Sequence, residues 1–356
     1  MFIESLTLQN FRSFKSEKFA FEASRTVING KNGRGKSNLL ESIYFLAIAK
    51  SNRGSPEREI IQTGEEHFQI QSSVRKEARK VDIRIYYDQQ SGKRIFLDES
   101  PLPRLSELLG TFNAVLFSPE DVDLVLRYPH ERRRMLDMLA SQASVSYLSD
   151  LQTYQRALTQ RNRLLKNGLS PAQAGEHLHP WDLQLAEAGA RIVRFRQDAV
   201  QVIGPSACGY YASVTHGEEL RVRYQSFSPA TGVSAIQSFL LEELEKGRDR
   251  EIRLGYTITG PHKDQLLFEI GGRDIQRHAS QGQMKSVLLA WKLAEAAFLE
   301  SIAREMPVLL LDDIFSELDV SRSLRLLDLL KGFNQIILTT ARDPDLPMED
   351  YHRIAI

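Results

Sequence analysis

Gly30-Lys31-Asn32-Gly33-Arg34-Gly35-Lys36-Ser37 is a complete G-x-x-x-x-G-K-S sequence, preceded by the apolar run 26–28 and followed by a helix-like run, 38–49. Strand, loop and helix therefore stand in the order that a phosphate loop requires, so the stretch predicts a nucleotide site and not merely a glycine-rich turn. The loop N–H groups would face the phosphates, Lys36 would reach the β- and γ-phosphate oxygens, and the Ser37 hydroxyl would bind Mg²⁺.

A second motif lies far along the chain, where the aliphatic run 308–311 ends in Asp312 and Asp313. Continuous aliphatic residues are typical of a buried parallel strand, and its carboxyl end faces the crevice in which ligands bind. Two adjacent acids repel each other there unless a cation lies nearby. We therefore predict a Walker B strand, in which Asp312 holds Mg²⁺, directly or through its hydration shell, and Asp313 orients the attacking water.

Two further motifs separate this chain from kinases and GTPases. Ser280-Gln281-Gly282-Gln283 precedes a long amphipathic run, 284–302, and Ser316-Glu317-Leu318-Asp319 follows the Walker B acids. They resemble the signature and D-loop motifs of the ABC ATPase class. Serine and glycine at a helix N-terminus can bind an anion. Because the phosphate loop already covers one nucleotide, we expect Ser280, Gly282 and Gln283 of one subunit to contact the ATP of a second subunit.

Composition is typical of a soluble intracellular enzyme. The chain has 356 residues, 42% hydrophobic and 26% charged, which favours two domains with full cores. Its single cysteine, Cys208, excludes a disulfide framework and a thiolate zinc site. The N-terminus carries an acid where a signal peptide is basic, and no run reaches the length of a membrane span. We predict a cytoplasmic protein.

The motifs organise the chain into a split head and an inserted arm. Strand-like segments alternate around the phosphate loop in residues 1–117, and strand signals return in residues 255–356. The intervening residues, 118–254, contain helix-like runs at 129–143, 146–166 and 180–201. The predicted fold is an α/β ABC-type P-loop ATPase head with an inserted, mainly helical arm.

With these residues in view, the chain closely resembles the RecF family, which is related to the heads of SMC and Rad50 proteins. The resemblance covers nearly the whole chain. Beyond the ATPase motifs it includes several segments that the wider ATPase class lacks: Leu8-Gln9-Asn10-Phe11-Arg12, Ser118-Pro119-Glu120-Asp121, Arg132-Arg133-Arg134, Gln160-Arg161-Asn162, the run 181–186 and Gly260-Pro261-His262-Lys263-Asp264.

The resemblance implies an ATP-dependent DNA-binding protein of recombinational repair and replication-fork maintenance. Its dimer would close around two ATPs with Mg²⁺, and a weak, DNA-stimulated ATPase would reset it. It would act with RecO and RecR to load recombinase at gaps and support the SOS response. In such heads an arginine approaches the nucleotide phosphates, and Arg12 stands at that position. Asp313 replaces the usual catalytic glutamate of ABC ATPases and, with Lys36, would carry a slow hydrolysis.

The arm carries a local basic excess on a chain whose net charge is zero. Between residues 127 and 166 there are eight basic residues and three acids. Arg156 and Arg163 are seven residues apart and so share one helix face, which suits a phosphate backbone. We predict that the arm binds DNA without reading its sequence, through six arginines: Arg132, Arg133, Arg134, Arg156, Arg161 and Arg163.

Some assignments stay open at the level of sequence. The Q-loop glutamine is Gln62 or Gln69, and Thr340 or Arg342 would replace the switch histidine. His262 is interpreted as structural, or as a contact at the head interface. An ABC transporter subunit would share every head motif, although it normally carries the switch histidine and lacks such an insertion. An ATP-dependent nuclease is excluded because only 37 residues follow Asp319. Intact catalytic residues disfavour a relic nucleotide site.

Overall fold

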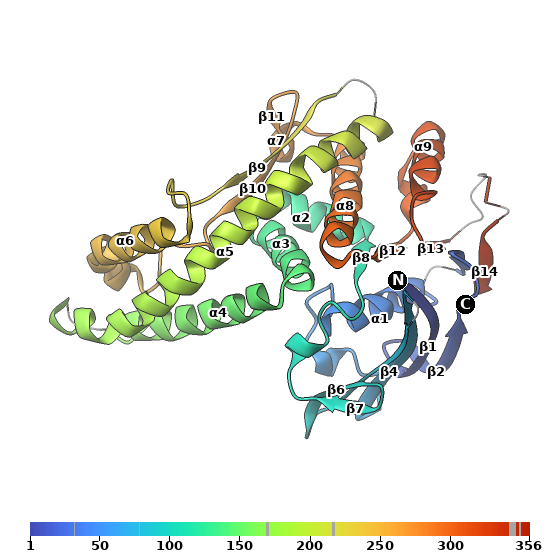
Figure 1. Ribbon diagram of the computed structural model, residues 1–356, viewed down its shortest axis with the longest axis horizontal. Coiled ribbons are helices and arrows are strands. Elements are labelled where there is room, and N and C mark those ends of the chain that lie inside the picture. Colours follow the sequence, from blue (N-terminus) through green and yellow to red (C-terminus); the bar gives the residue numbers. More distant parts are fainter. Residues whose placement is uncertain (32, 78, 169–170, 216–217, 342–346, 349) are drawn as a thin grey trace.

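The computed structural model of the chain describes all residues except 32, 78, 169–170, 216–217, 342–346 and 349 (Figure 1). A layered head occupies one side, and helices α4, α5 and α6 extend from it as an arm (Figure 1). The two chain termini lie near each other on the head (Figure 1).

The outer layer of the head is a six-stranded antiparallel sheet in the order β2-β1-β4-β5-β6-β7. Strands β4 and β5 alternate buried and more exposed residues, so one face of the sheet packs on the core. Its strands are β1 (Phe2–Phe11), β2 (Phe14–Ala20), β4 (His67–Lys76), β5 (Arg79–Asp88), β6 (Gly92–Leu97) and β7 (Ser100–Leu102).

The inner layer is a five-stranded parallel sheet in the order β14-β3-β13-β12-β8. Two of its strands come from the first third of the chain and three from the last sixth, so the head is assembled from both ends of the sequence. Strands β8, β12 and β13 are buried throughout, which explains their largely aliphatic sequences. The strands are β3 (Arg25–Asn29), β8 (Ala114–Phe117), β12 (Val308–Leu311), β13 (Ile336–Thr340) and β14 (His352–Ala355).

Helices fill the space on both sides of the parallel sheet. Helix α1 (Lys36–Ile48) packs against strands of both sheets, and nearly all of its residues are buried. Helix α8 (Gln281–Ala303) lies on the opposite face with α9 (Val320–Leu330), and Trp291 of α8 is fully buried in that core. The α/β ABC-type head predicted from the motifs is confirmed.

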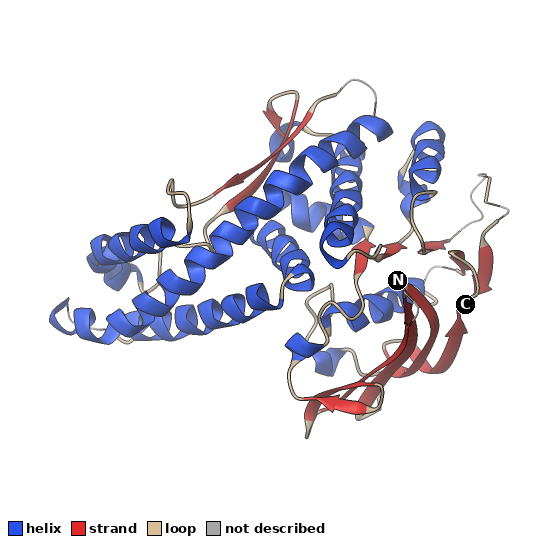
Figure 2. Ribbon diagram, in the orientation of Figure 1, coloured by secondary structure: helices blue, strands red, loops and turns tan. Residues whose placement is uncertain are grey.

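The arm is mainly helical, and a small antiparallel sheet runs beside it (Figure 2). Helix α5 is long enough to join both parts: its first half packs on α4 and α6, and its second half packs on α8. The elements of this region are α2 (Pro119–Arg127), α3 (Pro129–Ala143), α4 (Val145–Lys166), α5 (Pro171–Val214), β9 (Leu220–Gln225), α6 (Val233–Leu254), β10 (Gln265–Ile270), β11 (Arg273–Asp274) and α7 (Ile275–His278).

The structure corrects one predicted boundary and refines another. Helix α5 begins at Pro171 and not at Pro180, which lies inside the helix. Strand β9, from the segment assigned to the arm, pairs with β10, from the segment assigned to the head. Proline is common at the first position of a helix but also occurs inside long helices, so Pro180 does not fix the start of α5. Long-range pairing of strands 40 residues apart leaves no local sequence signal.

A buried ion cluster holds the arm helices together. Arg161 of α4 is fully buried and contacts two carboxylates, Asp182 of α5 and Glu251 of α6, each at 2.6 Å. Losing one partner of such a cluster would leave an uncompensated buried charge, which typically costs about 3–5 kcal/mol. Arg161 therefore stabilises the arm, and its prediction as a DNA contact is wrong. Arg132 of α3 is only 2% exposed, so this buried side chain is also corrected as a predicted DNA contact.

Candidate nucleotide site

The phosphate loop joins β3 to α1. Gly33 and Gly35 have φ values of 81° and 104°, in the left-handed region that favours glycine. A Cβ atom at Gly35 would lie 2.5 Å from Ser13 Oγ, so this position has neither the conformation nor the space for a side chain. Within the described part of the loop, Lys31 and Arg34 have exposed side chains, and Asn32 lies outside the described residues.

Lys36 is the first residue of α1 and curls back over the loop. Its Nζ donates hydrogen bonds to the carbonyl oxygens of Gly30, at 2.6 Å, and Lys31, at 3.1 Å. The side chain is 7% exposed. The ammonium group is thus held above the loop amides, at the place where phosphate oxygens of a bound nucleotide would be its partners.

Asp312 and Asp313 follow β12 and share a threonine from the neighbouring strand. The Thr339 hydroxyl of β13 donates to Asp312 Oδ1 at 2.6 Å, and the N–H of Asp313 donates to Thr339 Oγ1 at 3.0 Å. Asp313 itself has a φ of 43°, a left-handed conformation that costs a non-glycine residue roughly 1–2 kcal/mol. Strain of this kind is found at functional sites, where the surroundings hold a side chain in a required direction.

The phosphate loop and the Walker B carboxylates line one pocket of about 410 Å³. The volume lies within the range of about 300–1,000 Å³ that is usual for small-molecule sites. The Ser37 hydroxyl and the Asp312 carboxylate supply hard oxygen ligands, and Mg²⁺ in nucleotide sites commonly takes one or two protein oxygens together with phosphates and waters. These residues therefore fit Mg²⁺ and a nucleoside triphosphate. Among the described residues, no cluster of three or more His, Cys, Asp or Glu side chains could hold a metal by itself.

Three pocket residues were missed by the sequence analysis. Arg53 donates to Asn38 Oδ1 at 3.2 Å and lies 3.5 Å from a Glu120 carboxylate oxygen, and all three line the nucleotide pocket. Asn38 directly follows the phosphate loop motif, and Glu120 belongs to a segment that carried the family resemblance. Arg53 has no motif around it that could have marked it in advance.

Arg12 does not line the nucleotide pocket in this structure. Its guanidinium donates to both carboxylate oxygens of Glu41, at 3.2 and 2.8 Å, and to Ser55 Oγ at 3.0 Å. Glu41, on α1, is 1% exposed and also accepts a hydrogen bond from Ser51. Arg12 is thus anchored beside the helix that carries Lys36, and its contact with nucleotide phosphates remains a prediction.

The signature residues lie apart from the nucleotide pocket of the same chain. Ser280 caps α8: its hydroxyl accepts from the Gln283 N–H, and the Gln283 side chain accepts from the Ser280 N–H, which is a complete capping box. Gln283 also donates to Glu218 at 2.8 Å. Ser280 is exposed, and Gly282 is approached by the Arg322 guanidinium. None of the three predicted signature residues lines the pocket that holds Lys36 and Asp313.

The candidates for the Q-loop glutamine and for the switch residue lie in different parts of the head. Gln69 lies within β4. The backbone N–H of Gln62 donates to the carbonyl oxygen of Asn10, near the end of β1. Thr340 is buried at the end of β13, next to Thr339, whose hydroxyl reaches Asp312. Arg342 lies outside the described residues.

The remaining predicted DNA contacts divide into two groups. Arg133 donates to the Asp264 carbonyl oxygen, and Arg134 contacts Glu131 and the carbonyl oxygens of Ser51 and Asn52, so both are engaged within the protein. Arg156 and Arg163 are exposed on α4.

This fold and this site define an ABC-type P-loop ATPase head with a helical arm. Residues 2–352 match the family model described as RecF/RecN/SMC N terminal domain. A DNA replication and repair protein RecF of Agathobacter rectalis is 35% identical over 344 residues, which are 96% of this chain and 93% of that protein. A Bacillus cereus RecF is 37% identical and covers 96% of this chain and 92% of its own length.

Solved structures agree with these sequence matches. The structure of a recombination mediator protein RecF with ATP, in the RecFOR pathway, has a TM-score of 0.89 and 33% identity, and the match covers 97% of this chain and 93% of that one. An SMC head domain from Pyrococcus furiosus, 19% identical with a TM-score of 0.54, shares the fold. This chain belongs to the RecF family, which removes the transporter subunit as an alternative. No described helix is both long and apolar enough to span a membrane.

Proposed function

We propose that the protein is an ATP-dependent DNA-binding protein of replication and recombinational repair, in which ATP closes a dimer on DNA and slow hydrolysis releases it. The observation that carries this proposal is the single pocket lined by Lys36, Ser37, Asp312 and Asp313. The relatives are named DNA replication and repair proteins, and one structural relative is described with ATP.

Each residue of the pocket has a chemical part in the proposed hydrolysis. Lys36 exchanges its two carbonyl partners for phosphate oxygens when the nucleotide enters. Ser37 and Asp312 would hold Mg²⁺, which would supply positive charge beside the transferred phosphoryl group. Asp313 accepts a hydrogen bond from the attacking water. Thr339 fixes the backbone at Asp313 and the carboxylate of Asp312 and so keeps the two acids in different directions.

The separation of the signature from the pocket supports a shared site. The α8 N-terminus is an exposed anion site in each chain, and it can reach a γ-phosphate only when two heads face each other. ATP would thus drive dimerisation. One structural relative is a recombination mediator protein RecF of the RecFOR pathway. We therefore propose RecO and RecR as the partners of this protein at gapped DNA. Support of the SOS response would follow from this activity.

The test separates nucleotide binding from hydrolysis. Lys36→Met should abolish ATP binding in isothermal calorimetry, while Lys18→Met, a change of an exposed lysine on β2, should leave it intact. Asp313→Asn should retain ATP affinity and lower the turnover rate by roughly 10²-fold or more, as expected for loss of a general base. Turnover of Asp313→Asn at the wild-type rate would assign the base to another residue.

A further inference from the structure

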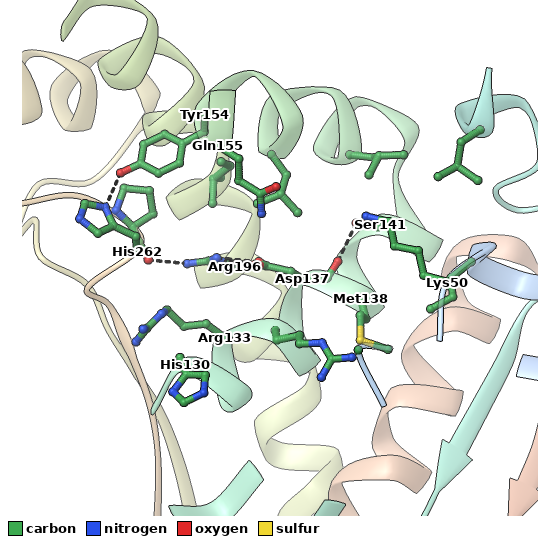
Figure 3. A pocket seen from close by; sticks show the side chains of 18 of the residues that line it. Lys50, His130, Arg133, Asp137, Met138, Ser141, Tyr154, Gln155, Arg196 and His262 are labelled. Carbon is green, nitrogen blue, oxygen red and sulfur yellow. Dashed lines mark hydrogen bonds and ion pairs between the residues drawn. The ribbon is translucent and has the colours of Figure 1, made fainter. Parts of the chain in front are cut away.

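A second and larger cavity, of about 590 Å³, lies between the head and the arm, outside the nucleotide pocket. Its head wall is formed by residues 48–57, after α1, and by Leu105 and Leu109 around the short helix η2 (Leu105–Glu107). The opposite wall comes from α3, α4 and α5 and from the turn at Pro261 and His262. Figure 3 shows these side chains converging on one space.

The two walls are tied together, so the cavity is preformed. Arg134 of α3 donates to the carbonyl oxygens of Ser51, at 3.3 Å, and Asn52, at 2.5 Å. A site that exists before its ligand arrives avoids the entropic cost of ordering the walls on binding.

Much of the lining is aliphatic and incompletely covered. Leu105, Met138, Leu151 and Leu158 each remain partly exposed at the cavity. Partly exposed aliphatic side chains in a concave site gain free energy when an apolar group replaces water, about 25 cal/mol per Å² buried.

The charges of the cavity are unbalanced. Its two carboxylates are already paired: Asp137 with Arg196 at 2.6 Å, and Glu57 with Lys93 at 2.6 Å. Among the described residues, Lys50 and Arg133 have no carboxylate at ion-pair distance, and Arg133 donates only to the carbonyl oxygen of Asp264. Burial and the nearby Arg196 guanidinium lower the pKa of Arg133 by more than the Asp137 and Asp264 carboxylates raise it.

The two cations lie on different sides of the cavity. In Figure 3, Arg133 lies beside His130 on the left and Lys50 extends toward Ser141 on the right, and the paired Arg196 and Asp137 lie between them. An occupant that satisfies this arrangement carries negative groups that reach the two cations and an apolar group that packs against the partly exposed aliphatic side chains of the walls.

We propose that this cavity, the head–arm cleft, binds an acidic peptide segment of a partner protein, with one large apolar side chain flanked by carboxylates. Aliphatic walls favour such a peptide over DNA, because unpaired bases bind by stacking on exposed aromatic rings. Among the residues that the structure describes, the aromatic side chains that line the cleft are Tyr154, His130 and His262, and His130 alone of these three is exposed. The proposal is independent of the ATPase function.

The test uses the full chain and a set of short fluorescein-labelled peptides in which aspartates flank one leucine or phenylalanine. Fluorescence anisotropy should detect binding by members of this set, and matched peptides with asparagine for aspartate, or serine for the apolar residue, should bind more weakly. Lys50→Glu should weaken binding by about fivefold or more, since it replaces an attraction with a repulsion. Leu158→Asn should weaken it through the apolar wall.

Lys18→Glu is the matched control, because Lys18 is an exposed cation on β2 that does not line the cleft. It should leave peptide affinity unchanged, and all variants should retain the wild-type circular dichroism and ATP affinity. The proposal is overturned if no acidic peptide binds better than its asparagine counterpart, or if Lys50→Glu has no effect. It is also overturned if a single-stranded oligonucleotide, and no peptide, loses affinity in Lys50→Glu, which would assign the cleft to nucleic acid.

Discussion

Thr339 lies outside every motif found in the sequence, yet its hydroxyl contacts both Walker B residues. Thr339 and Thr340 are adjacent in a strand, so their side chains point to opposite faces, and only one can reach the acids. From the sequence, Thr340 or Arg342 is expected to replace the switch histidine. The strand register, which pairs β13 with β12 from Ile336 opposite Leu309, decides that Thr339 faces Asp312.

His262 illustrates a residue whose part is structural. Its Nδ1 accepts from the Tyr154 hydroxyl at 2.6 Å, and its Nε2–H donates to the Thr257 carbonyl oxygen at 3.1 Å, so the neutral imidazole satisfies both partners. Burial lowers its pKa from 6.5 to about 4. The unfolded chain therefore binds a proton more readily than the native protein between these two values.

This pKa shift predicts a pH dependence of folding. The stabilisation by neutral His262 should be complete above pH 6.5 and should be lost as the pH falls toward 4, by about 3 kcal/mol in all. Urea unfolding of the wild type and of His262→Gln should be compared at several pH values across this window. The variant should show a smaller decrease of the unfolding free energy on acidification. Equal decreases in the two proteins would show that His262 does not titrate in this way.

Helix α4 shows how one element separates two kinds of arginine. Arg161 and Arg163 differ by two positions, about 200° around a helix, so one enters the buried ion cluster and the other faces solvent. Arg156 is seven positions before Arg163 and shares its face. The same exposed face also carries the polar residues Gln152, Thr159 and Lys166, none of which is acidic. This face is the part of the predicted DNA surface that the structure leaves accessible.

Replacement of both exposed arginines tests this surface. If Arg156 and Arg163 each neutralise one phosphate of duplex DNA, changing both to alanine should reduce the slope of log K against log salt by roughly 0.9 per contact, about 1.8 in all. Binding should be measured with ATP present. Arg194→Ala, which removes an exposed arginine paired with Asp198 on α5, should leave the slope unchanged. An unchanged slope in a folded double variant would move DNA binding away from α4.

At the scale of the whole molecule, the signature residues at the α8 N-terminus do not line the nucleotide pocket of their own chain. We therefore expect ATP, but not ADP, to produce dimers, because only the γ-phosphate extends to the opposing α8 N-terminus. Ser280→Arg should bind ATP as a monomer and fail to dimerise in sedimentation velocity. Ser100→Arg, on the edge strand β7, should dimerise normally. ATP-induced dimers of Ser280→Arg would exclude the shared site.

The sequence by itself determined the class of the protein and the chemistry of its site. The phosphate loop, the Walker B acids and the signature are short, locally encoded segments, because each depends on backbone geometry within a few residues: glycines at positive φ, a strand end and a helix N-cap. Their order along the chain was sufficient to predict the split head, and the basic excess between residues 127 and 166 indicated where charge gathers.

Only the tertiary structure decided which of those charges reach solvent and what lies between the head and the arm. Whether an arginine is a salt-bridge partner or a surface cation depends on carboxylates far away in sequence, as Glu251 is from Arg161, and on which face of its helix packs. The head–arm cleft likewise combines residues from six separate segments. Such contacts follow from the packing of elements, and a single sequence records no pairing between distant residues.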